Sequence, residues 1–201
     1  SWALGRVLRA PWAASPPAAP AKAATDADDP LAHPPHGEWR VWTTRDGLPS
    51  NQVFAVRVDG PRVWAGTAAG LALLEGDHWR TFGTADGLPH RMVLALDVSP
   101  RTGDVWIGTV GGLARLSGGR IDSWTQTDSG LPNDFVHAVR CDPDEDAVWA
   151  ATAMGAGRLD LRTGSWTIYT HENTPMHEPW TYSVAAGDGK VFVGAWGGGV
   201  L

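Results

Sequence analysis

Short apolar runs separated by tight-turn residues dominate the chain from Trp39 onward. In the first unit these runs are rich in β-branched and aromatic residues, and turn signals such as Asp59-Gly60-Pro61 separate them. Runs of five or six residues bounded in this way predict β-strands. The four strands predicted in the first unit span residues 53–58, 62–67, 70–74 and 78–82.

The same unit recurs with a nearly constant period. One set of aromatic residues is spaced 42, 43 and 43 residues apart and comprises Trp64, Trp106, Trp149 and Phe192. A second set is spaced 40, 45 and 42 residues apart and comprises Trp39, Trp79, Trp124 and Trp166. A turn motif occupies the same place in three units, as Asp46-Gly47-Leu48-Pro49, Asp86-Gly87-Leu88-Pro89 and Ser129-Gly130-Leu131-Pro132. A period of about 40 to 45 residues with four short strands is typical of one β-propeller blade.

The aromatic residues of these strands are expected to form the core. The set that begins with Trp64 is predicted to pack between neighbouring blades, because a sheet buried on both faces needs large apolar side chains. Cys141 aligns with Val58 and Val98 in the first strand of each unit. It is therefore predicted to be a buried structural thiol.

The first 38 residues have a different composition. Ala and Pro dominate them, with proline-containing stretches at residues 15–20 and 33–35. Such a composition is typical of an extended tether. The sequence therefore divides into an Ala/Pro-rich tether at residues 1–38 and propeller repeats at residues 39–201.

Charge and composition exclude several classes of protein. The net charge of −6 and the isoelectric point near 5.5 disfavour a phosphate-binding surface, so no nucleic-acid partner is expected. Cys141 is the only cysteine, which rules out an internal disulfide and a cysteine-based zinc or haem motif. No stretch of the chain approaches the roughly 18 to 20 apolar residues of a membrane span. No cofactor is predicted.

The order of the motifs is similar to that of a known repeat. Gly-Leu-Pro, Val-x-Ala-Val, Val-Trp-Ala-Gly-Thr and Gly-Leu follow one another in residues 47–71, and related copies occupy residues 87–113 and 130–157. This order resembles the two-component regulator propeller repeat. The resemblance implies seven-bladed propellers in the periplasmic or extracellular part of bacterial sensors, or in secreted proteins. It transfers no catalytic residue, because the repeat motif contains none.

The number of predicted strands is too small for a complete ring. We expect one leading outer strand at residues 39–43, three complete blades, and two strands of a fourth, with its third strand beginning at Val200-Leu201. Seven blades need about 294 residues. The predicted fold class is therefore an all-β propeller of four-stranded antiparallel blades, with about three and a half blades of an expected seven. An open sheet edge invites pairing with a partner chain.

The fourth unit lacks the recurring loop motifs. Residues 171–180 replace the Gly-Leu-Pro loop, and residues 195–199 replace the turn between the second and third strands. Because strands alternate in direction, both segments are expected on one face of the propeller. Loops on a rigid scaffold commonly carry binding residues. The candidate ligand-binding or partner-binding residues are His171, Glu172, His177, Glu178, Trp180 and Trp196.

Several functions remain open for this face. Binding of a small ligand, a glycan or a protein is favoured, because the loops combine tryptophans with polar side chains. A metal site at the histidines and glutamates fits no known spacing, so no metal ligand is predicted. A lyase-like acid/base pair of His177 and Glu178 lacks a nucleophile, so no catalytic residue and no enzyme is predicted. A further interpretation is that the loops serve only to pack against the next blade.

A second class of function is structural. The tether and the open sheet edge suit an assembly subunit docked in a larger complex. On the opposite face, an acidic hairpin is predicted to be a solvated turn and not a calcium loop, because the EF-hand pattern is absent. Its residues are Asp142, Asp144, Glu145 and Asp146.

Overall fold

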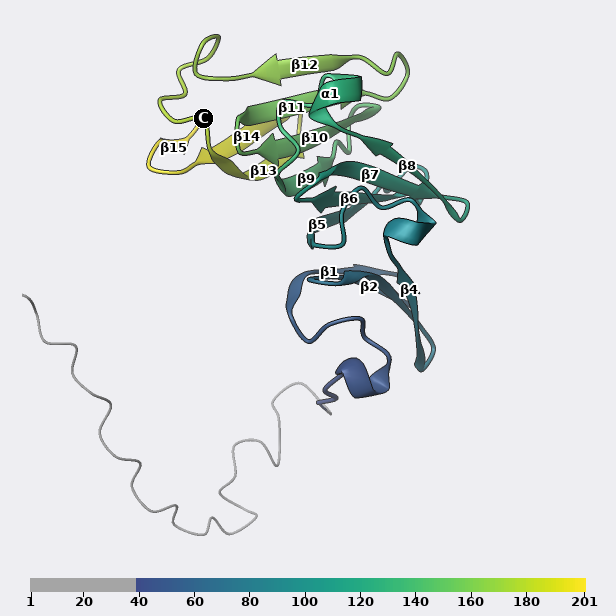
Figure 1. The fold of residues 1–201 in the computed structure, drawn as a ribbon. Coiled ribbons are helices and arrows are strands. Elements are labelled where there is room, and N and C mark those ends of the chain that lie inside the picture. The colour runs from purple at the N-terminus through teal and green to yellow at the C-terminus, as the bar shows by residue number, and fades with distance from the viewer. Residues whose placement is uncertain (1–38) are drawn as a thin grey trace, which may run out of the picture. The chain divides into compact units, whose positions relative to one another are not determined.

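The computed structural model describes residues 39–201 (Figure 1). Residues Trp42–Leu201 form one compact unit, which contains all the described helices and strands. Four antiparallel sheets, here called blades one to four, follow one another along the chain. Blade one contains β1 (Val53–Asp59), β2 (Arg62–Thr67), β3 (Gly70–Glu75) and β4 (His78–Phe82). Blade two contains β5 (Val93–Val98), β6 (Val105–Thr109), β7 (Gly112–Ser117) and β8 (Arg120–Trp124).

Blade three is built in the same way, and blade four has three strands. Blade three contains β9 (Val136–Cys141), β10 (Ala147–Thr152), β11 (Gly155–Asp160) and β12 (Trp166–Tyr169). Blade four contains β13 (Thr181–Gly187), β14 (Lys190–Ala195) and β15 (Gly199–Val200). Helices in the described residues are limited to α1 (Gln126–Ser129) and two short 3₁₀ turns at Thr44–Asp46 and Thr84–Asp86.

The first strands of successive blades lie beside one another. Strand β5 contacts both β1 and β9, and β9 also contacts β13 (Figure 1). Each blade pairs its strands in chain order, from the first strand outward. This arrangement confirms the prediction of an incomplete β-propeller with four-stranded antiparallel blades.

Every first strand carries a β-bulge one residue after its start. The register of pairing to the second strand shifts at the same place in β1, β5, β9 and β13. A bulge leaves one residue unpaired and re-aims its side chain. The four bulge residues are Phe54, Leu94, His137 and Tyr182.

Three of the four aromatic residues predicted to pack between blades are buried. Trp64, Trp106 and Trp149 confirm the prediction, which is wrong at Phe192, because its side chain is 53% exposed. Each tryptophan packs on the last aromatic residue of the outer strand in its own blade, with ring centroids 6.3, 5.2 and 5.4 Å apart. The partners of the three tryptophans are Phe82, Trp124 and Tyr169.

The sequence alignment of the outer strands was wrong at Trp124. Strand pairing places Trp124 opposite Leu113, as Phe82 is placed opposite Leu71. Ile121, and not Trp124, therefore occupies the position of Trp79. Both faces of a blade are buried, so a tryptophan fits at either position, and the aromatic spacing alone could not distinguish them.

The leading outer strand predicted at residues 39–43 is also wrong. These residues form no strand, and the chain turns into the 3₁₀ segment Thr44–Asp46. In blades one to three the outer strand bonds to the third strand of its own blade. Residues 39–43 have no such strand beside them among residues 39–201. Trp42 nevertheless packs edge-on against Trp79, with ring centroids 5.8 Å apart.

The end of blade four and the single cysteine agree with expectation. β15 begins at Gly199, one residue before the predicted start of the third strand, and pairs with Gly194 and Ala195. Cys141 is buried, and its burial together with the neighbouring Asp97 carboxylate raises the pKa of the thiol. A thiol held in its neutral form is a poor nucleophile.

The remaining expectations concern the tether and membrane-spanning segments. The predicted tether at residues 1–38 lies outside the described residues, so its boundary at residue 39 stays a prediction. Within residues 39–201, no helix combines the length and apolar character needed to cross a membrane.

The burial of Trp106 generates a stability prediction. Its side chain is 0% exposed, whereas Phe192, at the equivalent position of blade four, is 53% exposed. We expect Trp106→Ala to lower the free energy of unfolding by about 3 to 5 kcal/mol, because it leaves a cavity between blades. Chemical denaturation checks this value. Phe192→Ala is the matched control and should cost far less, so equal losses from both variants would contradict the assignment of the core.

Candidate functional site

The two loops of each blade that were predicted to share a face are joined by a recurring hydrogen bond. A backbone N–H in the turn after the second strand donates to the carbonyl of the residue just before the first strand. The bond has N···O distances of 3.0, 3.4, 3.1 and 2.9 Å in blades one to four. In blade four it runs from the Trp196 N–H to the Trp180 carbonyl. Residues 171–180 and 195–199 therefore meet on one face.

The loop at residues 170–180 follows the conformation of the loop before blade three. The Thr170 N–H donates to Asn173 Oδ1 at 2.9 Å, as the Thr125 N–H donates to Asp128 Oδ1 at 2.8 Å. An amide oxygen thus replaces a carboxylate oxygen in the same turn. The prediction that this loop breaks the repeat is therefore wrong for its first turn. It holds at Pro175, which stands in the place of Gly130, because proline cannot adopt the φ of 87° that Gly130 has.

Two further contacts extend the match between these loops. The hydroxyls of Thr174 and Ser129 each donate to the carbonyl four residues earlier, at 2.7 Å. Met176 is buried five residues before β13, as Leu131 is buried five residues before β9. Met can fill a core site shaped for Leu because its side chain is unbranched and adaptable. The missing Gly-Leu-Pro motif concealed this equivalence in the sequence.

The turn at residues 195–199 does depart from the repeat. In the other blades a buried threonine hydroxyl at this turn donates to a glycine carbonyl, as Thr152 Oγ1 does to the Gly155 carbonyl at 2.6 Å. Ala195 has no hydroxyl, and its turn encloses three residues where the Thr152 turn encloses two. The first residue of the longer turn, Trp196, is 67% exposed.

The structure separates the six candidate residues into groups. His171 and Glu172 line a hollow of about 370 Å³, together with Pro179. Its other wall belongs to the loop before blade three and the turn after β10, through Gln126, Leu131, Pro132 and Met154. Trp180 and Trp196 are exposed and joined through their backbones. His177 and Glu178 are exposed and do not line the hollow. Within residues 39–201, no group of three His, Cys, Asp or Glu side chains is placed to hold a metal ion.

A row of aromatic rings lies beside these loops and was missed by the sequence analysis. It runs from Phe135 to His137, Tyr182 and Trp196, with successive ring centroids 4.7, 4.3 and 5.6 Å apart. We call these four side chains the aromatic row. His137 belongs to no sequence motif that would mark it as a site residue. The sequence does contain one signal. His137 and Tyr182 occupy the same bulge position of their strands, directly before the small residues Ala138 and Ser183.

His137 forms the centre of the aromatic row and is neutral near pH 7. Its ring stacks on Tyr182 with an angle of 27° between planes. Burial lowers the pKa of His137, and a hydrogen bond to the Thr181 backbone opposes this shift only partly. Its Nδ1 atom is buried and has no hydrogen-bond partner among the described residues. The imidazole therefore contributes an uncharged ring to the row.

Thr181 fixes the blade-four end of the row. Its side chain is fully buried, and its hydroxyl accepts from the Thr152 N–H at 2.8 Å. The same hydroxyl faces the carbonyls of Thr152 and Gly155 at 2.9 and 3.0 Å. Thr181 thus joins the first strand of blade four to blade three, directly beside Tyr182. Valines occupy the equivalent position in β5 and β9.

A buried carboxylate ties together the first strands of blades one to three. Asp97 on β5 forms ion pairs with Arg57 of β1 at 2.7 Å and with Arg140 of β9 at 3.6 Å. It also accepts from the Cys141 N–H at 2.8 Å. Asp97 is therefore paired from both neighbouring first strands, β1 and β9, which is what a buried charge needs to be tolerated.

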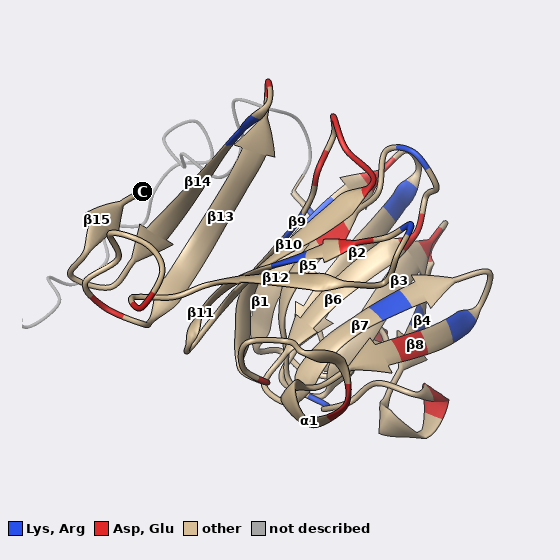
Figure 2. Ribbon diagram, turned by 90° about the horizontal axis from the view of Figure 1, so that it is seen from above, with Lys and Arg blue, Asp and Glu red and all other residues tan. Residues whose placement is uncertain are grey.

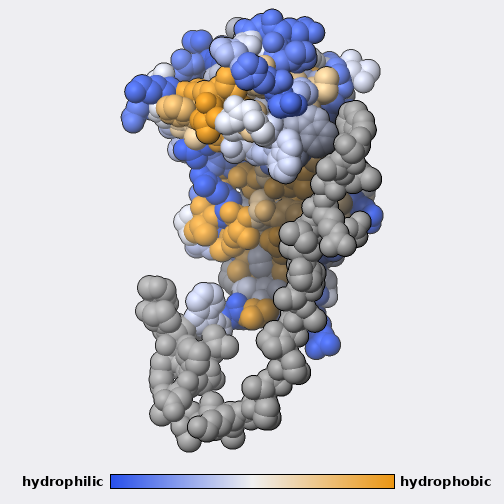
Figure 3. All heavy atoms as spheres, turned by 90° about the vertical axis from the view of Figure 1, so that its left-hand side faces the viewer, coloured by the Kyte–Doolittle hydropathy of each residue, from blue (hydrophilic) through white to orange (hydrophobic). Residues whose placement is uncertain are grey.

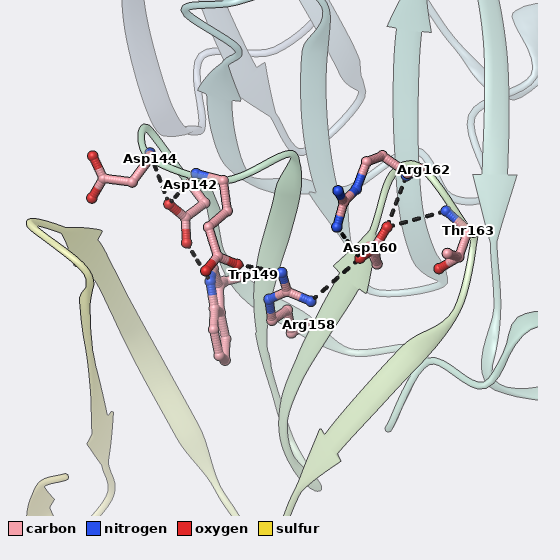
Figure 4. A network of polar contacts seen from close by, with 8 residues as sticks. Asp142, Asp144, Trp149, Arg158, Asp160, Arg162 and Thr163 are labelled. Carbon is pink, nitrogen blue, oxygen red and sulfur yellow. Dashed lines mark hydrogen bonds and ion pairs between the residues drawn. The ribbon is translucent and has the colours of Figure 1, made fainter.

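The acidic hairpin on the opposite face is a structural network (Figure 4). Asp142 is buried and accepts from the backbone of its own turn and from Trp149 Nε1 at 3.1 Å. The prediction of a solvated turn is therefore wrong at Asp142. Asp144 accepts from the Gly189 N–H at 2.9 Å, and Glu145 pairs with Arg158. The hairpin thus braces blade four against blade three.

Comparisons with solved structures identify the fold. The chain is similar to the extracellular domain of a protein described as a hybrid two-component system, from B. thetaiotaomicron, with a TM-score of 0.73 and 21% sequence identity. The match covers 80% of this chain and 24% of that domain, so the chain spans about a quarter of its length. A comparison with protein-family models and a search of curated proteins each found no match.

Other structures with the same fold have different descriptions. An ancestral GH74 enzyme matches with a TM-score of 0.57 and 14% identity over 73% of this chain and 22% of its own. The WD40 β-propeller domain of Doa1 matches with a TM-score of 0.58 and 16% identity over 74% of this chain and 49% of its own. These likenesses confirm the propeller fold, and function must be argued from the site.

The Thr181 hydroxyl generates a second stability prediction. We expect Thr181→Val to destabilise the protein by about 1 to 3 kcal/mol, because it leaves the buried Thr152 N–H without a partner. Urea denaturation measures the change. Ser183→Ala, which removes an exposed hydroxyl two residues away on β13, is the control and should leave stability within about 0.5 kcal/mol. The proposed clamp is refuted if the two variants are equally stable.

Proposed function

We propose that this chain is a non-catalytic recognition or sensory module that binds a ligand or partner on the loop face of blades three and four. The observation that carries the proposal is the aromatic row, whose two end members, Phe135 and Trp196, are 40% and 67% exposed. Exposed aromatic rings on a rigid scaffold are typical of binding surfaces. The candidates His171, Glu172, His177, Glu178 and Trp180 lie in the loops of the same face.

The resemblance and the structural likeness support the same kind of function. The order of repeat motifs resembles that of sensor propellers, and a structure with this fold is the extracellular domain of a two-component system protein. We therefore propose that the chain belongs to an exported bacterial protein and is periplasmic or extracellular. Its ligand is a small molecule, a glycan or a protein.

The side chains support binding more than catalysis. Each ring that a ligand covers contributes on the order of 1 to 3 kcal/mol through the apolar area buried. The histidines and glutamates of the loop at residues 170–180 are divided between the hollow and the exposed surface. An acid/base mechanism instead needs two groups that converge on one reacting atom.

A second candidate function is an assembly subunit, and one observation favours it. Apolar side chains are exposed along β1, at Val53, Val56 and Val58, beside an apolar hollow of about 260 Å³. Figure 3, which faces the side of the first strands, shows hydrophobic atoms at this surface. Exposed apolar patches of this kind often mark contacts with another protein or sheet.

The proposal is tested by comparing affinity and stability in the same variants. The full-length chain is screened against glycan and peptide arrays, and the dissociation constant and melting temperature are then measured for Trp180→Ala, Trp196→Ala and His177→Ala. We expect the tryptophan variants to weaken binding about tenfold with little change in melting temperature, because these side chains are exposed.

The comparison has a matched control on the same blade. Phe192→Ala also removes an exposed aromatic ring, but from β14 outside the loops, and should retain full affinity. Full affinity in all three loop variants would reject the proposed face. Loss of folding in them would show that the loops serve only to pack the blade.

A further inference from the structure

We propose that the aromatic row binds an organic cation, the ammonium or guanidinium group of a small molecule or of a peptide side chain. This inference rests on the proposed function, because it names the ligand class for the same face. It is carried by the geometry of Phe135, His137, Tyr182 and Trp196 and by the charges of the segments that carry these rings.

The row brings four aromatic rings into contact at the junction of two blades. Phe135 and His137 belong to the start of blade three, whereas Tyr182 and Trp196 belong to blade four. Phe135, Tyr182 and Trp196 are exposed. The faces of aromatic rings carry partial negative charge and attract cations that come within about 6 Å of the ring centre.

The segments that carry the row contain acids but no lysine or arginine. Residues 126–139, 170–187 and 195–201 contain no Lys or Arg. The acids in these segments are Asp128, Asp134, Glu172 and Glu178. In Figure 2 the loop between β12 and β13 contains red acidic residues and no blue Lys or Arg.

The charges nearby do not cancel this acidic character. Asp128 stays ionised, because the Thr125 N–H donates to its carboxylate and lowers its pKa. Arg140 directly follows the first segment, but its guanidinium is paired with the buried Asp97. Neutral His137 adds no positive charge near pH 7. A cation is therefore favoured over an anion or an uncharged ring at this face.

Rings elsewhere in the chain already attract its own cations. The Arg115 guanidinium lies 5.7 and 5.8 Å from the ring centroids of Trp106 and Trp124. Arg80 lies 4.8 Å from the centroid of Phe82. These rings lie in the outer parts of blades one and two, away from the row. The row presents the same chemistry to a ligand from outside the chain.

The test uses pairs of probes that differ in charge but not in shape. Choline is compared with 3,3-dimethylbutan-1-ol, and the peptide acetyl-Gly-Arg-Gly-amide with its citrulline analogue. Calorimetric titration of the full-length chain at low ionic strength gives the affinities. We expect each cation to bind at least tenfold more tightly than its neutral counterpart and to weaken as salt is added. Choline binding indicates a small-molecule source, and binding of the arginine peptide alone indicates a protein source.

Variants assign the binding to the row. Tyr182→Leu and Trp196→Leu keep an apolar side chain but remove the ring, and each should lower cation affinity at least fivefold. Phe192→Leu changes an exposed ring outside the row and should leave affinity within twofold. Circular dichroism and melting temperatures establish that all three variants are folded.

Three results would overturn the inference. These are equal affinity for charged and neutral probes, unchanged cation affinity in both row variants, and no binding of either cation up to about 10 mM. None of them rejects the proposed function, which fails only if the loop variants leave binding of the array-selected ligand unchanged. The two proposals are therefore distinguished by separate measurements.

Discussion

The burial of both faces of each sheet is the constraint on which the rest of this structure depends. A single four-stranded blade cannot cover its own apolar faces, so each blade is stable only against its neighbours. The tryptophan of the second strand and the last aromatic residue of the outer strand meet this need together, as Trp106 and Trp124 do. Phe192 shows what happens without such a partner. It occupies the equivalent position of blade four, which has no outer strand in the described residues, and its side chain is half exposed.

Close packing of the first strands explains why the polar contacts there are so specific. Asp97 pairs with two arginines and accepts from a backbone N–H, all from the two strands beside it. At Thr181 a hydroxyl that bonds to the preceding blade replaces a valine of the other blades. Such contacts hold neighbouring strands in one register. They also hold the bulge residues next to them, where His137 and Tyr182 stack on each other.

The sequence predicted those features that the repeat itself imposes. The bounds of β2 and β4 agree with the predicted strands, because turns and β-branched runs are local signals. Trp124 was misaligned because both faces of the outer strand are buried, and the strand at residues 39–43 failed because a strand needs a partner. The aromatic row joins residues 45 positions apart through a bulge in each strand, and no local pattern reports such a contact.

Positions that repeat within this chain and positions that vary carry different information. The turn threonines Thr67, Thr109 and Thr152 make the same hydrogen bond in three blades, so the scaffold requires them. The bulge column instead reads Phe54, Leu94, His137 and Tyr182, which differ in size, polarity and hydrogen-bonding capacity. The scaffold therefore makes no demand on side-chain chemistry at the bulge. The two rings in contact at such positions, extended by Phe135 and Trp196, are therefore the part of the chain on which the proposed binding site rests.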